Sequence, residues 1–331
     1  MVDSDLELPG GQPETARTFR NILCLSGGGY RGLFTAIVLE HIEARLQAIG
    51  VASLRDHFDL IAGTSIGGLL ACGIACGVPA AKLQAALREH GPKVFPAKRF
   101  QFLRKLFGPL YSTPPLVNAV KASLGGAEAQ TLDKVQTPLL VPAVSWISGA
   151  VTLFASRGLV GAAAKPITLL DVCLSTSAAP TYFPPNTIPN VDVLVDGGLA
   201  ANAPDLAALA AATELWRLPL QSYQVVSIGT AGSAAGGMAA SVPRSGIRWA
   251  QGAQIVQLVL AAQERHTVAS CKTLLGDRFF RIDQPPTQHH LALQALDKVD
   301  ASVTTTLSNL AAQAIAAARV HPPAWAQPLV Q

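Results

Sequence analysis

The sequence predicts an α/β protein in which helices cover a mainly parallel sheet. Two strand-loop-helix units follow each other near the N-terminus, and consecutive units of this kind build parallel sheets. Strand and helix patterns then keep alternating to the end of the chain. The composition agrees with a folded domain, because 50% of the 331 residues are hydrophobic and only 14% are charged, which excludes a disordered chain.

The elements can be assigned in order. The first unit has a strand over 21–25, a glycine-rich loop, and a helix over 31–49 in which apolar residues recur at helical spacing. The second unit has a strand over 57–62, a glycine-rich turn, and an apolar helix over 69–76. Further strands are predicted over 139–146, 151–155, 191–195, 223–228 and 278–282. Further helices are predicted over 168–177, 204–215, 247–275 and 297–319.

We expect one domain over residues 18–320, because no repeat and no long Pro/Gly/Ser linker divides the chain. Residues 1–17 are acidic and polar, lack the regions of a secretory signal, and are expected to form a flexible leader. The tail 321–331 is expected to lie on the surface without regular structure. The uncharged stretch 60–81 is long enough for a membrane span, but five glycines interrupt it, which favours a buried strand-turn-helix.

Charge and cysteine usage exclude other classes of protein. A net charge of +4 is too small, on this length, to indicate a polymeric nucleic-acid partner. The five cysteines form no C-x-x-C pair and have no histidine nearby that would suggest zinc. We therefore expect no metal, no cofactor, and a reduced, cytoplasmic setting.

The loop after the first predicted strand fits the G-x-G-x-x-G pattern of dinucleotide-binding proteins, with Gly27, Gly29 and Gly32 in the three positions. A nucleotide-binding oxidoreductase is therefore one alternative. That interpretation requires an acid at the end of the second strand, whereas the second strand here ends in Ala62-Gly63-Thr64. Under either interpretation, backbone N–H groups at a helix N-terminus favour binding of a phosphate or an oxyanion.

The second loop has the G-x-S-x-G pattern of a nucleophile elbow, from Gly63 to Gly67, on a strand-to-helix turn. Ser65 is the predicted nucleophile, and an incidental glycine-rich turn is the alternative. A serine hydroxyl requires a base, and Asp196 follows a predicted strand at the sheet edge where active sites of α/β proteins lie. An Asp in an ordinary β-turn is the competing interpretation. His266, His289 and His290 are expected to be solvated surface residues.

Four stretches, in this order, together resemble the patatin-like phospholipases. They are SGGGYRG at 26–32, GTSIGG at 63–68, SAAPTYFPP at 177–185 and VDGG at 195–198. The resemblance implies a three-layer fold and hydrolysis of the fatty-acyl esters of membrane phospholipids through an acyl-enzyme. It also implies that Ser65 is the nucleophile and that Asp196 is its partner in a Ser-Asp dyad without histidine.

The same resemblance assigns supporting residues around the dyad. It implies that the oxyanion loop consists of Gly27, Gly28, Gly29 and Arg31. The residues that support the motifs are Gly32, Gly63, Gly67, Gly197 and Gly198. Ser26 departs from the family, in which many members have Asp at this position. A lone carboxylate is a poor base at neutral pH unless it is desolvated, so we expect a partly apolar setting for Asp196.

A basic segment is a candidate for membrane contact. Residues 90–127 contain no acid and six lysines or arginines, a local charge of +6 in a chain whose net charge is +4. A helix over 99–107 would place Phe100 and Phe107 opposite Arg104 and Lys105, an arrangement that suits an anionic lipid surface. The alternative is a helix that packs its apolar side on the core and leaves its basic side in solvent.

Within the family, the start LSGGGYRGL at 25–33 and the compact length most resemble the bacterial phospholipases of CBASS antiphage defence. That resemblance implies activation by a cyclic dinucleotide such as cGAMP and action at the inner face of the membrane. A constitutive lipid acyl hydrolase and a noncatalytic lipid-binding module remain alternatives. No residue identifies a nucleotide site, and a homo-oligomer is compatible with the sequence without being specified by it.

Overall fold

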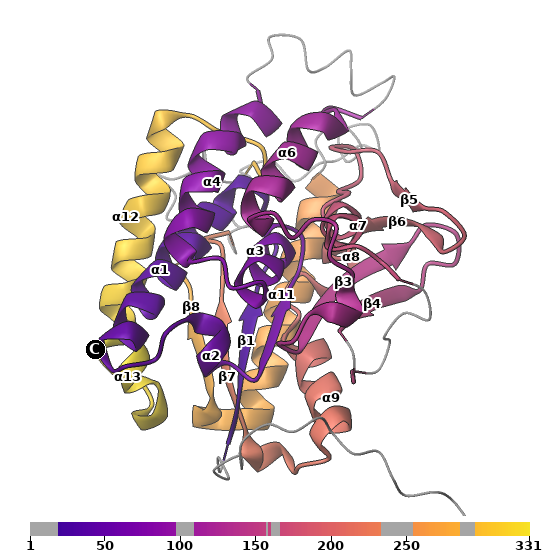
Figure 1. The fold of residues 1–331 in the computed structure, drawn as a ribbon. Helices are drawn as coiled ribbons and strands as arrows, with labels where there is room; N and C mark the ends of the chain where they lie inside the picture. The colour runs from indigo at the N-terminus through magenta and orange to yellow at the C-terminus, as the bar shows by residue number, and fades with distance from the viewer. Residues whose placement is uncertain (1–18, 97–108, 157, 160–165, 233–253, 285–294) are drawn as a thin grey trace, which may run out of the picture.

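A computed structural model describes residues 19–96, 109–156, 158–159, 166–232, 254–284 and 295–331. It contains an eight-stranded mixed sheet between layers of helices (Figure 1). The predicted α/β class, with a mainly parallel sheet, is confirmed. The strands are β1 (Arg20–Leu25), β2 (Leu60–Gly63), β3 (Leu139–Ser145), β4 (Val151–Ala155), β5 (Asn186–Ile188), β6 (Asp192–Asp196), β7 (Tyr223–Ile228) and β8 (Phe279–Ile282).

The strand order is β5-β6-β3-β2-β1-β7-β8, and β4 pairs with β3. The pairs β1–β2, β1–β7, β2–β3 and β7–β8 are parallel, whereas β3–β4, β3–β6 and β5–β6 are antiparallel. Leu25 pairs with both Gly63 and Ile228. The three segments that follow β1, β2 and β7 therefore leave the sheet side by side at the carboxyl ends of these strands, which is where ligands bind in open α/β sheets.

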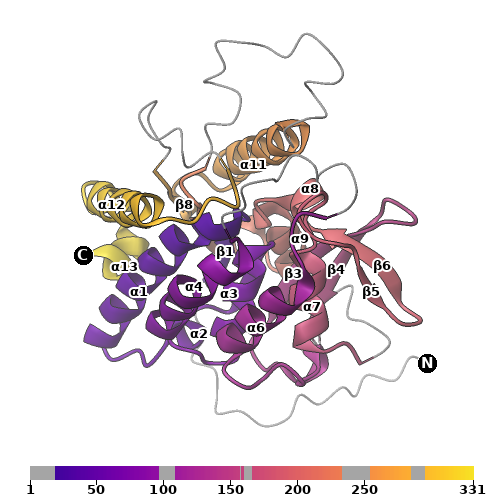
Figure 2. The ribbon, with the colours of Figure 1, turned by 90° about the horizontal axis from the view of Figure 1, so that it is seen from above.

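Helices cover both faces of the sheet. In order they are α1 (Gly32–Ala48), α2 (Leu54–His57), α3 (Ile66–Ala75), α4 (Ala80–Val94), α6 (Thr113–Leu124), α7 (Leu169–Thr176), α8 (Gly198–Ala201), α9 (Asp205–Trp216), α11 (Gln254–Leu275), α12 (Ala301–Ala318) and α13 (Gln327–Val330). Figure 2 shows α1, α4 and α6 on one side and α11 on the other.

Strand β1 is buried on both faces, as a central parallel strand requires. Leu23 and Leu25 join a core with α1, α3, α4 and α12, while Ile22 and Cys24 join a second core with α9 and the C-terminal half of α11. Two cores, one on each face of the sheet, make the architecture three-layered.

Several boundaries differ from the sequence-based expectations. The second strand begins at Leu60 rather than at residue 57, because His57 ends α2 and Asp59 accepts a hydrogen bond from the backbone N–H of Asn21 (2.7 Å). The expectation of an irregular surface tail is wrong. The tail contains α13, and Ala326, Leu329 and Val330 are buried in the core that includes α1.

The uncharged stretch 60–81 is confirmed as a buried strand-turn-helix made of β2 and α3. Of the helices within the described ranges, none is both long and apolar enough to cross a membrane. Phe100, Arg104, Lys105 and Phe107 of the candidate membrane segment lie outside the described residues, as do the expected leader 1–17 and the two histidines His289 and His290.

Candidate active site

Ser65 lies on the turn between β2 and α3 in a conformation that side chains rarely adopt, with φ 54° and ψ −123°. The flanking glycines make this turn possible. A Cβ atom on Gly63 would lie 2.1 Å from the carbonyl oxygen of Gly67, and one on Gly67 would lie 2.3 Å from that of Leu25. The strand-turn-helix geometry that G-x-S-x-G predicts is therefore present, with the serine at its apex.

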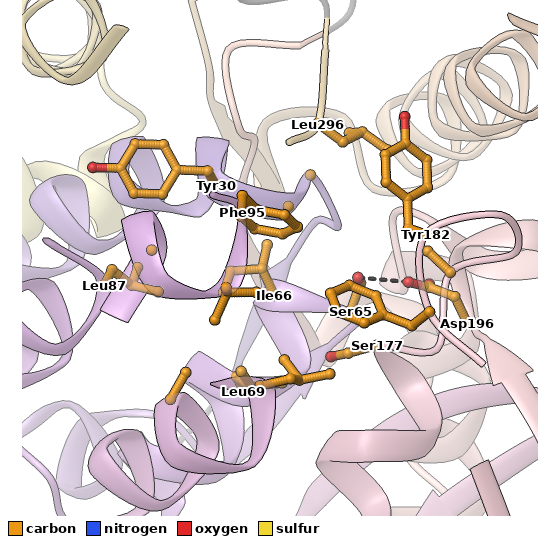
Figure 3. A pocket seen from close by; sticks show the side chains of 18 of the residues that line it. Tyr30, Ser65, Ile66, Leu69, Leu87, Phe95, Ser177, Tyr182, Asp196 and Leu296 are labelled. Carbon is orange, nitrogen blue, oxygen red and sulfur yellow. Dashed lines mark hydrogen bonds between the residues drawn. The ribbon is translucent and has the colours of Figure 1, made fainter. Parts of the chain in front are cut away.

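Asp196 ends β6 and faces Ser65 across the sheet edge. The Ser65 hydroxyl donates a hydrogen bond to Asp196 Oδ2 (2.7 Å; Figure 3), and the backbone N–H of Gly198 donates to Oδ1 (2.7 Å). Strand β3 brings the two residues together, because it pairs with β2 through Leu139 and with β6 through Ala143. Two residues that lie 131 positions apart in the sequence thus share a hydrogen bond.

The Gly-Gly pair after Asp196 permits this approach. A Cβ on Gly197 would lie 2.1 Å from the carbonyl oxygen of Pro142, and one on Gly198 would lie 3.0 Å from Asp196 Oδ1. Gly32, the first residue of α1, also lies too close to a neighbour for a side chain, because a Cβ atom there would lie 2.3 Å from Ile66. These glycines leave room for the backbone and side-chain contacts on which the hydrogen-bonded pair depends.

Burial raises the pKa of Asp196 to about 6, and the hydrogen bonds from Ser65 and Gly198 oppose that rise. The side chain is only 6% exposed. The partly apolar setting expected for this carboxylate is present. Asp196 is therefore ionised at neutral pH and is a stronger base than an ordinary aspartate.

Only some of the backbone N–H groups in the glycine loop are available to donate a hydrogen bond to a ligand. The backbone N–H of Gly27 donates to the carbonyl oxygen of Asn202 (2.9 Å), and that of Arg31 donates to the carbonyl oxygen of Gly28 (3.2 Å). Gly28 and Gly29 line the same cavity as Ser65. Among the residues that the structure describes, none accepts a hydrogen bond from the N–H of Gly28 or Gly29.

A mainly apolar cavity opens beside Ser65 and Asp196 (Figure 3). Its walls come from α3, α4 and α6, and α11 contributes Val256 and Leu260. Side chains that line it include Ile66, Leu69, Leu87, Val94, Phe95, Leu116, Ala119, Phe183 and Leu296. Such a cavity suits a hydrocarbon chain held next to a nucleophile.

Sequence patterns do not identify several parts of this site. They predict no helix in the regions of α4 and α6, and they do not mark Asn202. Within residues 263–266, Glu264 is buried and only Arg265 and His266 are exposed. The exposure of His266 agrees with the expectation. A helical-spacing count would have found α4, but nothing in the sequence marks Glu264 as an inward-facing acid.

Within the described ranges, no group of three or more His, Cys, Asp or Glu residues is arranged to hold a metal ion. The second strand ends in Gly63 and Thr64, and the Thr64 hydroxyl donates to the carbonyl oxygen of Ala201 (2.6 Å). An acid that could bind the ribose of a dinucleotide does not stand at this strand end.

Comparison with known proteins places the chain in a family. Residues 23–209 match the family described as "Patatin-like phospholipase". The "cGAMP-activated phospholipase" of Pseudomonas aeruginosa is 34% identical over 299 residues, which cover 87% of this chain and 86% of that protein. The "cGAMP-activated phospholipase" of Vibrio cholerae is 32% identical over 325 residues, which cover 88% of each chain. "Patatin-like protein 2" of Arabidopsis thaliana is 35% identical over 225 residues, which cover 61% of this chain and 54% of that one.

The resemblance carried by the four motifs is thereby confirmed, and the oxidoreductase and noncatalytic alternatives are not favoured. The chain is a hydrolase and belongs to the patatin-like phospholipase family.

Proposed function

We propose that Ser65 and Asp196 are the catalytic dyad with which this phospholipase cleaves fatty-acyl esters of membrane phospholipids. The observation that carries this assignment is the 2.7 Å hydrogen bond from the Ser65 hydroxyl to Asp196 Oδ2 beside an apolar cavity. A base bonded to a strained, partly buried serine that lines a cavity is the arrangement that acyl transfer requires.

In the first half of the reaction, Asp196 accepts the hydroxyl proton while Ser65 Oγ bonds to the ester carbonyl carbon. The tetrahedral intermediate then collapses, the bond to the lysophospholipid oxygen breaks, and that oxygen takes the proton from Asp196. In the second half, Asp196 accepts a proton from water, whose oxygen attacks the acyl-enzyme. Collapse of this second intermediate releases the fatty acid and returns the proton to Ser65.

We assign the oxyanion donors to the N–H groups of Gly28 and Gly29. Both residues line the cavity, whereas the N–H groups of Gly27 and Arg31 already donate to backbone carbonyls. Each such donor contributes about 3 kcal/mol to stabilisation of the tetrahedral intermediate. Of the four residues expected to form the oxyanion loop, we therefore assign the donor role to Gly28 and Gly29 and not to Gly27 or Arg31.

We also propose that a cyclic dinucleotide activates the enzyme and that the enzyme acts at the inner face of the membrane. Two relatives that cover most of this chain are named cGAMP-activated phospholipases, which supports this regulation. The basic, aromatic sequence at 99–107 supports contact with anionic lipid through Phe100, Arg104, Lys105 and Phe107. Unchanged binding of a folded Phe100→Ser/Phe107→Ser variant to anionic vesicles would contradict this contact.

The decisive experiment measures fatty-acid release from phosphatidylglycerol and phosphatidylethanolamine vesicles, with and without cyclic dinucleotides. We expect activity in the wild type and none in Ser65→Ala. Ser308→Ala, on α12 and away from the cavity, controls for loss of a serine elsewhere. Activity that requires a cyclic dinucleotide supports the regulated function, and activity without one indicates a constitutive hydrolase. Full activity of Ser65→Ala would reject the dyad.

A further inference from the structure

A largely buried ionic cluster lies next to the glycine loop. Arg281 of β8 is its centre. One of its nitrogens, Nη2, donates to Glu264 and to Asp283 Oδ2 (2.8 Å). The other, Nη1, donates to Ser26 Oγ (2.9 Å) and to Ser227 Oγ (2.8 Å). The guanidinium therefore joins β8 and α11 to the residue immediately before the glycine loop.

A second chain of hydrogen bonds reaches the same loop through Glu264. Glu264 Oε2 accepts from Asn202 Nδ2 (2.8 Å), and the neighbouring Gln263 accepts from the Asn202 backbone N–H (2.6 Å). The carbonyl oxygen of Asn202 then accepts from the N–H of Gly27 (2.9 Å). Asn202 follows α8, the short helix that begins directly after the turn of Asp196.

These contacts tie together the two segments that build the site. The glycine loop is held at Ser26 by Arg281 and at Gly27 by Asn202, while Asn202 is held by Glu264. Taking charged side chains out of water has a desolvation cost that their pairing offsets only in part, and apolar residues of similar size often stabilise a core as well or better. Unlike apolar residues, the cluster makes directional hydrogen bonds, which fix the positions of the glycine loop and of Asn202.

We infer that Arg281 and Glu264 are positioning residues, which hold the glycine loop at the distance from Ser65 that stabilisation of the oxyanion requires. Both lie outside residues 23–209, the part of the chain that matches the family. The inference rests on the proposed roles of Ser65 and of the glycine loop.

Two serines bonded to the same guanidinium nitrogen give a matched test. Ser26 and Ser227 are both buried, and each accepts a hydrogen bond from Arg281 Nη1. Only Ser26 adjoins the glycine loop. We expect Ser26→Ala to lower kcat on a soluble short-chain ester about 10-fold or more, with KM within about twofold, because small displacements of catalytic groups cost up to about 10²-fold. Ser227→Ala is expected to keep wild-type kcat, and Ser26→Thr, which keeps the hydroxyl, is expected to recover most of it.

Glu264→Gln tests the second chain of bonds, and Lys272→Met removes an exposed charge from the same helix as its control. We expect kcat to fall in Glu264→Gln while KM and the acidic limb of the pH profile, set by Asp196, stay unchanged. Thermal unfolding of every variant shows whether it is folded at the assay temperature. Equal losses of kcat in Ser26→Ala and Ser227→Ala would overturn the inference. Wild-type kcat in both Ser26→Ala and Glu264→Gln would also overturn it. Activity of Ser65→Ala would instead reject the proposed function.

Discussion

At the scale of single residues, the site depends on one carboxylate that is held in an unfavourable environment. Asp196 is almost fully buried, and its hydrogen-bond partners are a hydroxyl and a backbone N–H rather than a cation. Burial without a positive partner raises a carboxyl pKa, which makes the carboxylate more basic. A Ser-Asp pair can therefore work at neutral pH without an intervening histidine.

The pH dependence of hydrolysis follows from that pKa. In the proposed mechanism Asp196 must be ionised to accept the serine proton, and its pKa is raised to about 6. We expect kcat/KM on a soluble ester to be low at pH 5, half-maximal near pH 6, and level above pH 7. A rate profile that is flat between pH 5 and pH 8 would contradict Asp196 as the base.

Replacing Asp196 by Asn should abolish turnover and stabilise the fold. The folded-state pKa lies above the ordinary value of 3.8, so the folded protein loses stability as the pH rises from 3.8 to about 6, and the full penalty is present above that pH. At 1.36 kcal/mol per pKa unit, the penalty at pH 8 is at most about 3 kcal/mol. The variant should therefore unfold at a higher temperature than the wild type at pH 8, and this difference should shrink at pH 5. Retained turnover would contradict the assigned role, and a lower unfolding temperature at pH 8 would contradict the penalty.

Among the secondary-structure elements, helices α4 and α6 form part of the cavity wall. Helices α4 and α6 pack on each other and line the cavity through Leu87, Leu116 and Ala119. Helix α6 begins with prolines at its first positions, where the missing N–H groups cost nothing, and ends at Gly125 in a left-handed conformation. The cavity wall is thus a well-defined helix rather than a loop.

A larger residue on this wall should shorten the acyl chains that the enzyme accepts. Ala119 is buried and lines the cavity, so Ala119→Trp would fill space next to Ser65. We expect hydrolysis of long-chain esters to fall at least about 10-fold relative to short-chain esters, measured as the ratio of the two kcat/KM values. Lys121→Trp, on the exposed side of the same helix, should leave this ratio unchanged. An unchanged ratio in Ala119→Trp would show that the acyl chain lies elsewhere.

At the scale of the whole molecule, we propose that residues 18–320 form one domain, and the structure argues for including the tail. One sheet runs through all eight strands, and α13 packs on α1. Arg319 Nε also donates to the carbonyl oxygen of Val330 (2.7 Å), which closes the tail onto the end of α12. The two ends of the described chain therefore contribute to a common core.

Removal of residues 321–331 should destabilise the whole domain. The deletion exposes the surface of α1 that Leu329 and Val330 cover, and burial of each such side chain contributes about 1.5–3 kcal/mol. We expect a single unfolding transition at a lower temperature, followed by circular dichroism, with Gln331→Ala as a control for change at the exposed terminus. An unfolding temperature equal to that of the wild type would show that the tail is dispensable.

The class of fold, the family and the two loops of the site could all be predicted from the amino-acid sequence. Strand-loop-helix order, Gly63-Thr64-Ser65-Ile66-Gly67 and the Asp196-Gly197-Gly198 turn are local patterns, and local sterics act on adjacent residues. The strands β1 and β7 were predicted to within a residue because continuous apolar runs mark central strands.

Contacts between residues far apart in the sequence could not be predicted, because they depend on how the strands and helices pack in three dimensions. The pairing of β3 with both β2 and β6 brings Asp196 to Ser65, and the packing of α11 turns Glu264 inward to Asn202 and Arg281. The backbone contacts of the glycine loop likewise engage the N–H groups of Gly27 and Arg31 and leave those of Gly28 and Gly29 without an acceptor among the described residues. The hydrogen bond from Arg281 to Ser26 joins residues 255 positions apart, and one sequence carries no pattern that records which buried polar groups satisfy one another.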